Sequence, residues 1–321
     1  MEHARGRSAD PAGRLARAEE RGACRLDERV CREAWAEALR LHELWLDGAG
    51  GRACLLAGIA MEGLRAPQAR LERASLQDVA LPGADLHGAR CEGSAWERCD
   101  LSLANLARAE FDGARLEGVN LGDASLAAAS FSGAVLEDVS FEKARAPASR
   151  WLEARIARAD FSGALLPGAS FHQASLMECL WRGADLTEAL FYRATLRLCR
   201  FAETRCEGAR FNEAQLEFCQ WQDAQLGRAR FTHAELTGAA FLRCAMEECD
   251  FRGATLRGAQ FAGSRLAGAR FRDAVCAGAD FRGADLRGAR ELTLHQLLQA
   301  RTDETTVLPW GAPGPAMRGS R

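Results

Sequence analysis

Large apolar residues recur at every fifth position of this chain, from Leu71 to Leu286. A small residue, usually alanine, stands two positions before each of them, and Ala146 is the one clear exception in the large position. A period of five matches neither the period of about 3.6 of a helix nor the period of about 2 of a strand. The chain must therefore turn a corner every five residues, which predicts a solenoid.

A second period of twenty residues lies on top of the first. Aromatic residues gather in two opposite columns, and the two columns between them are almost entirely aliphatic. One aromatic column contains Phe111, Phe131, Trp151, Phe171 and Phe191, and the other contains Phe141, Phe161, Trp181, Phe201 and Trp221. Stacking of like residues on like predicts a four-sided coil of twenty residues. Roughly 11 to 12 such coils at a spacing of about 4.8 Å give a rod on the order of 55 Å long.

The flanking segments predict caps for the two ends of the rod. Residues 27–46 form an amphipathic pattern with Asp27 as a plausible N-cap, and Thr293 to Gln296 form a capping box that opens a helix through about Ala300. We therefore expect four regions. They are an N-terminal arm and capping helix over 1–51, the repeats over 52–290, a C-terminal cap over 291–308 and a disordered tail over 309–321.

Composition indicates a soluble protein in a reducing compartment. The formal net charge is -2, no stretch is long and apolar enough to span a membrane, and residues 1–17 lack the apolar core of a signal peptide. Nine of the twelve cysteines occupy the inward positions of the repeat, where they act as small apolar residues. We therefore expect free thiols and a cytoplasmic location.

No residue pattern points strongly to catalysis, a cofactor or a metal. Cys179, Cys199 and Cys219 should stack in one ladder, which suggests either a thiol metal or redox site or, as we favour, inert core thiols. The six histidines are scattered, and the G-x-G-x-x-A pattern at residues 48–53 follows a helix where a dinucleotide site needs a strand. We expect a protein that is not an enzyme and that holds neither cofactor nor metal.

The repeat resembles a known family. Ala84-Asp85-Leu86, Ala184-Asp185-Leu186 and Ala284-Asp285-Leu286 are similar to the A-(D/N)-L-x-x unit of pentapeptide-repeat proteins, and the resemblance covers about three quarters of the chain. It implies an all-β solenoid, a right-handed quadrilateral β-helix with the large and small residues inside. Some members of the family bind DNA gyrase as duplex mimics, and others accompany secretion systems. Ala146-Pro147 departs from the unit, so we expect a kink or bulge there.

Charge is distributed unevenly along the predicted rod. Residues 72–142 contain 13 acidic and five basic side chains, whereas residues 143–290 contain 17 acidic and 22 basic ones. A duplex mimic needs a long acidic face, and the candidate acidic surface is Glu92, Asp100, Asp112, Glu117 and Asp123. Outward residues of both charges nevertheless occur on all four sides, which makes a duplex mimic less favoured. Direct nucleic-acid binding by the basic end is less favoured still, because acids interleave with the arginines.

Apolar residues at outward positions give the leading hypothesis. Met177, Leu180, Tyr192, Leu198 and Phe218 form the candidate partner-binding surface. The alternative is that a terminal arm, such as residues 1–25 or the C-terminal tail, covers them. We interpret the chain as a non-catalytic interaction scaffold for a protein partner, with a gyrase inhibitor or protector and a secretion-system accessory as alternatives. Leu294, Leu297 and Leu298 either support a homodimer through the end caps or cover the last coil.

Overall fold

The computed structural model describes residues 28–315, and the expected arm over 1–25, the N-cap Asp27 and residues 316–321 of the expected tail lie outside this range. Helix α2 spans Glu28–Leu46 and helix α3 spans Leu294–Gln299. The three-residue strands are β1 Leu55–Ala57, β2 Ser75–Gln77, β3 Ala95–Glu97, β4 Arg115–Glu117, β5 Val135–Glu137, β6 Arg155–Ala157, β7 Ser175–Met177, β8 Thr195–Arg197, β9 Arg200–Ala202, β10 Gln220–Gln222 and β11 Ala240–Leu242.

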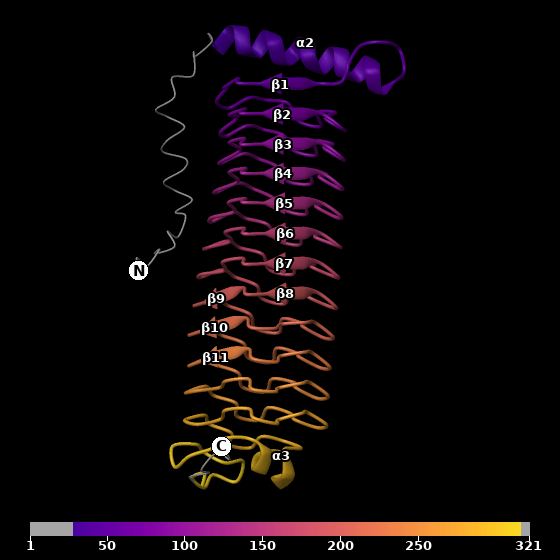
Figure 1. Cartoon of the computed structure of the whole chain (residues 1–321). Helices are drawn as coiled ribbons and strands as arrows, with labels where there is room; N and C mark the ends of the chain where they lie inside the picture. The colour runs from indigo at the N-terminus through magenta and orange to yellow at the C-terminus, as the bar shows by residue number, and fades with distance from the viewer. Residues whose placement is uncertain (1–27, 316–321) are drawn as a thin grey trace, which may run out of the picture.

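The strands stack in parallel with a constant register of twenty residues. Strands β1 to β8 form one sheet in sequence order, and β9, β10 and β11 form a second sheet on a neighbouring side of the rod. Leu56 pairs with Leu76, and Leu76 pairs with Trp96. Figure 1 shows the resulting column of coils, with α2 across one end and α3 at the other. The predicted parallel β-solenoid with twenty-residue coils and helical caps is confirmed.

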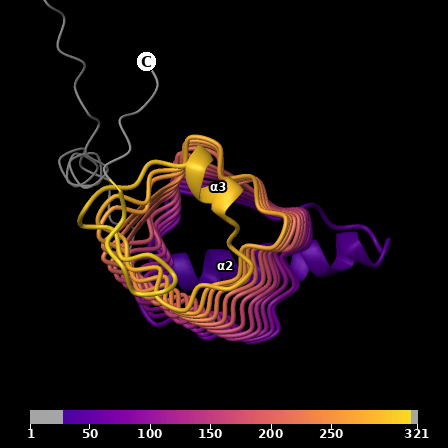
Figure 2. The same cartoon turned by 90° about the horizontal axis from the view of Figure 1, so that it is seen from below.

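Each coil has four faces, which Figure 2 shows end-on. Parallel bridges between coils hold the middle of each face, and the corners between faces are turns. We number the faces in chain order. The first is centred on the column Ala60, Ala80 and Asp100, the second on Arg65, Asp85 and Asn105, the third on Arg70, Arg90 and Glu110, and the fourth on Ser75, Ala95 and Arg115.

The inward residues fill the coil completely. The rings of Phe111 and Phe131 are parallel with centroids 5.0 Å apart, whereas Trp151 and Phe161 from the two opposite aromatic columns meet edge to face at 5.9 Å. Both arrangements are favourable for aromatic pairs. Because a flat ring is about as thick as the spacing between coils, one aromatic residue per coil builds an unbroken stack.

The expected kink at Ala146-Pro147 is wrong. Arg145 stays bridged to Ser125 and Leu165, and the N–H of Ala128 still donates to the carbonyl of Pro147 at 2.9 Å. Proline fits because it occupies the first residue of a corner, whose N–H takes no part in the ladder between coils. The missing donor of proline therefore costs no hydrogen bond.

Polar side chains as well as apolar ones close the two ends. In the N-terminal cap, Nδ1 of the buried His42 accepts a hydrogen bond from the N–H of Cys54 at 3.0 Å. In the C-terminal cap, the predicted capping box at Thr293 is present and Leu297 is buried. The amide of Gln296 donates to the carbonyls of Phe271 at 2.8 Å and Ala274 at 2.9 Å.

The chain beyond α3 also packs on the rod. Arg301 pairs with Asp280 and Val307 pairs with Asp285, so two sides of one more coil are present. The segment 309–315, expected to belong to the tail, turns back so that Pro313 pairs with Val307 in antiparallel fashion.

Candidate interaction surfaces

The corner between the fourth and first faces carries three large apolar side chains. Met177, Leu198 and Phe218 come from three successive coils, and their exposed fractions are 43%, 53% and 54%. We call this set the apolar corner. Leu198 and Phe218 are twenty residues apart and therefore stack in register, whereas Met177 pairs with Arg197 and lies one position earlier on the same corner.

The same corner is polar or glycine elsewhere along the rod. Nearer the N-terminus it carries the ion pairs Asp78–Arg98 and Asp138–Arg158, in which the closest atoms are 2.7 and 2.8 Å apart. Nearer the C-terminus it carries Gly238, Gly258 and Gly278. The apolar corner is therefore a local feature of an otherwise polar edge.

The backbone of this corner makes the large residues costly. Leu198 and Phe218 both have a φ of 56°, in the left-handed region that glycine adopts freely. A side chain in that region costs roughly 1–2 kcal/mol. The ring of Phe218 lies over Gly238, where an added Cβ would come within 2.9 Å of it. Two strained, exposed apolar residues are therefore kept where glycine would serve the fold.

The other two residues of the predicted surface lie elsewhere. Leu180 sits in the middle of the first face, next to the apolar corner. Tyr192 sits on the corner between the third and fourth faces, so a whole face separates it from Phe218. Its hydroxyl donates to Glu213 at 3.0 Å, and the guanidinium of Arg193 lies 4.8 Å from its ring centroid. Glu213 also pairs with Arg193, so Tyr192 belongs to a polar cluster of its own.

The candidate acidic residues are divided between different sides of the rod. Glu92 and Asp112 lie on the corner between the third and fourth faces, whereas Asp100, Glu117 and Asp123 lie on and beside the first face.

Several of these acids bind neighbouring groups of the rod itself. Asp100 accepts from the Asn120 amide at 3.0 Å, and Glu117 pairs with Arg115 at 3.0 Å. Asp112 accepts from the N–H of Ser132 at 2.9 Å. Hydrogen-bond donors and an arginine of the rod therefore already bind several of these carboxylates.

The cysteine ladder is sealed inside the rod. Cys179, Cys199 and Cys219 are fully buried, and their thiols donate to backbone carbonyls, such as that of Leu196 at 3.4 Å from Cys219. Burial raises the pKa of another core thiol, Cys206, to about 12. Within residues 28–315, no three His, Cys, Asp or Glu residues group as metal ligands would, and the ten cysteines from Cys54 to Cys276 have free thiols. No helix in the same range is both long enough and apolar enough to cross a bilayer.

Family models match most of the repeats. A model described as pentapeptide repeat region matches residues 174–251, and a model of eight pentapeptide repeats matches residues 84–123, 154–180 and 249–288. Together they cover more than half of the chain. No curated protein sequence shows a significant match.

The chain also matches solved structures of pentapeptide-repeat proteins, with low TM-scores. HetL from the cyanobacterium Nostoc sp. strain PCC 7120, involved in heterocyst differentiation regulation, is 20% identical over 85% of this chain and 98% of its own, with a TM-score of 0.27. Rfr23 from the cyanobacterium Cyanothece 51142 is 26% identical over 29% of this chain and 63% of its own, with a TM-score of 0.26. Full-length QnrB1, a plasmid-mediated fluoroquinolone resistance protein, is 16% identical over 78% of this chain and 94% of its own, with a TM-score of 0.17.

Proposed function

Because the chain belongs to the pentapeptide-repeat family, we propose that it is a non-catalytic scaffold that binds a protein partner through the apolar corner. The observation that carries the proposal is the exposure of Met177, Leu198 and Phe218 on successive coils. Clustered apolar side chains on a soluble protein often mark an interface. A rigid rod orders few residues on binding. Most of the free energy gained by burying the three apolar side chains therefore contributes to affinity.

Strain at the corner supports the same proposal. Glycine at positions 198 and 218 would expose less apolar surface to solvent. It would also adopt the left-handed backbone conformation without strain. The partner we propose presents an apolar segment to this edge. Leu180 on the adjacent first face widens the contact, whereas Tyr192 stands outside it. The free, buried cysteines from Cys54 to Cys276 support a cytoplasmic location.

The test is partner capture by purified full-length protein carrying Leu198→Gly and Phe218→Gly. The matched control is Leu103→Gly, because Leu103 is 67% exposed and has a φ of 60° on the corner between the first and second faces. We expect the double variant to lose the partner retained by the wild type and the control, although glycine relieves the left-handed backbone and should make neither variant less stable than the wild type. Capture that is equal in all three would contradict the proposed site.

The gyrase alternative has a direct test of its own. Because the candidate acids lie on different sides and several are bound within the rod, we expect micromolar protein to leave gyrase supercoiling unchanged, with and without a quinolone. Inhibition or protection that disappears on Asp100→Asn and Asp123→Asn would instead place the function on the acidic coils.

A further inference from the structure

The third face becomes strongly basic towards the C-terminal end. Residues 210, 230, 250, 270 and 290 form one bridged column, and all of them are arginine except Asp250. Arg210 and Arg230 are direct neighbours about 4.8 Å apart along the rod, as are Arg270 and Arg290. Like charges in this position destabilise a sheet. All four arginines are exposed, and none forms an ion pair with any part of the chain that the structure describes.

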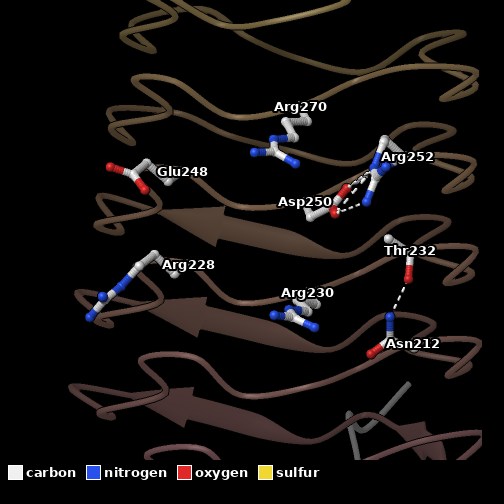
Figure 3. Close-up of a pocket in the computed structure, with 8 residues that line it drawn as sticks. All are labelled: Asn212, Arg228, Arg230, Thr232, Glu248, Asp250, Arg252 and Arg270. Carbon is white, nitrogen blue, oxygen red and sulfur yellow. Dashed lines mark hydrogen bonds and ion pairs between the residues drawn. The ribbon is translucent and has the colours of Figure 1, made fainter.

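The one acid in this column does not neutralise its neighbours. Figure 3 shows the carboxylate of Asp250 turned along its own coil towards Arg252. Its two oxygens accept from Nε and Nη2 of Arg252 at 2.9 and 2.7 Å. Arg252 therefore takes the hydrogen bonds of Asp250, and Arg230 and Arg270 on either side form no ion pair with that carboxylate.

These residues line a shallow pocket of about 420 Å³. Four arginines and two acids, Glu248 and Asp250, give its lining a formal charge of +2. Thr232 accepts a hydrogen bond from the amide of Asn212, which leaves its hydroxyl hydrogen free to donate into the pocket. The pocket thus offers several donors around an uncompensated positive centre.

We propose that this pocket binds a small ligand that carries two or more phosphoryl groups. Guanidinium groups donate two parallel hydrogen bonds to such oxygens. Arg230 and Arg270 are two coils apart, so they provide two binding points separated by about 10 Å. Glu248 lies on the corner between the second and third faces. It repels a long polyanion that crosses the face at that corner, and this favours a short ligand.

The experiment is calorimetric titration of the full-length protein with inorganic tripolyphosphate, with orthophosphate as the single-phosphoryl comparison. We expect saturable binding of tripolyphosphate, tighter than that of orthophosphate. Arg230→Gln with Arg270→Gln should weaken it by roughly tenfold or more, because two charge-assisted contacts are lost. The matched control is Arg200→Gln with Arg257→Gln, which removes the same charge from exposed positions on and beside the opposite first face and should leave the affinity unchanged.

A third variant separates the pocket from general charge effects. Asp250→Asn removes the acid that occupies Arg252, so we expect it to tighten tripolyphosphate binding. Absence of tripolyphosphate binding at millimolar concentration, or equal weakening by both arginine pairs, would overturn the proposal. Tighter binding of a single-stranded oligonucleotide than of tripolyphosphate would reassign the face to nucleic acid. The Leu198→Gly and Phe218→Gly variant should bind tripolyphosphate normally, so this proposal stands or falls separately from the apolar corner.

Discussion

At the scale of single residues, the buried indoles show how the repeat treats polar atoms. Nε1 of Trp96 and of Trp151 donates at 2.8 Å to a serine two positions earlier, Ser94 or Ser149. Trp181 and Trp221 follow a cysteine at the equivalent position, and their buried Nε1 atoms have no partner. A buried donor without an acceptor costs about 1–3 kcal/mol. A serine two positions before the tryptophan therefore supplies the acceptor, and only two of these four coils have that serine.

This rule predicts that Cys179→Ser stabilises the protein. The new hydroxyl would accept from Nε1 of Trp181 as Ser149 does from Trp151, and we expect a gain of about 1 kcal/mol in the free energy of unfolding. Cys199→Ser is the control, because the residue two positions later is Phe201, which has no donor. Chemical denaturation measures both. A gain for both variants, or for neither, would show that the indole is not the cause.

His42 makes the N-terminal cap sensitive to pH. Burial lowers the pKa of His42, and its neighbours Glu72, Arg70 and Glu43 modify that effect. Because the unfolded chain has the ordinary histidine pKa of about 6.5, it binds the proton more readily than the folded chain does. The contribution of neutral His42 is therefore complete above that pH and is lost as the pH falls below it.

We expect His42→Asn to reduce this loss. Between about pH 7 and about pH 5, the wild type should lose more stability than the variant, as measured by thermal unfolding at each pH. His295→Gln is the control, because His295 is exposed on α3 at the other end of the rod. Identical profiles for the wild type and His42→Asn would rule out His42 as the titrating group.

At the scale of elements, the caps differ from the coils that they cover. A coil has its backbone groups paired with coils on both sides, whereas the last coil leaves carbonyls open. At this end side chains supply further donors: Gln296 donates to the carbonyls of Phe271 and Ala274, and Oγ1 of Thr306 donates to the carbonyl of Phe281 at 3.0 Å. The sequence predicted α3 from its capping box, but the same Gln296 also closes the coil.

We therefore expect Gln296→Ala to destabilise the end of the rod by about 1–3 kcal/mol, since it removes the amide donor to the carbonyls of Phe271 and Ala274 and breaks the capping box. Hydrogen exchange should become faster in the last coil and remain unchanged near β1. Gln299→Ala is the control, because Gln299 is exposed and its side chain contacts His295 at 3.0 Å. Equal exchange in the two variants would contradict the closing role of Gln296.

At the scale of the whole molecule, the rod has two different ends. Leu294 and Leu298, expected either to support a dimer or to cover the last coil, are 66% and 57% exposed, and only their neighbour Leu297 is buried. Trp310 is 64% exposed and follows Pro309, whose carbonyl accepts from the N–H of Gly288 at the same end. The C-terminal end therefore presents apolar surface beyond what the last coil needs.

This surface predicts a homodimer through the C-terminal ends. Light scattering after gel filtration should give twice the chain mass of 34.8 kDa, falling to one chain for Leu294→Ser with Leu298→Ser. Leu55→Ser is the control, because Leu55 is 75% exposed at the other end of the rod. A wild-type monomer at high micromolar concentration would refute the dimer.

By itself, the sequence determined the inside of this protein. The five-residue spacing of inward residues fixes where the chain turns, and the column of Phe111, Phe131 and Trp151 fixes the coil at twenty residues, because only stacking satisfies both periods. Pro147 was misread because a local breaker signal does not tell whether the N–H at that position is used by the ladder.

Only the tertiary structure decided how the outside is grouped. It kept Met177, Leu198 and Phe218 together, because they share a corner, and separated Tyr192 from them by a face. It also turned Asp250 to Arg252 and left Arg230 and Arg270 uncompensated. The packing period constrains only the inward side chains. Which outward side chains lie on one corner, and which of them form ion pairs, is therefore decided by the folded surface.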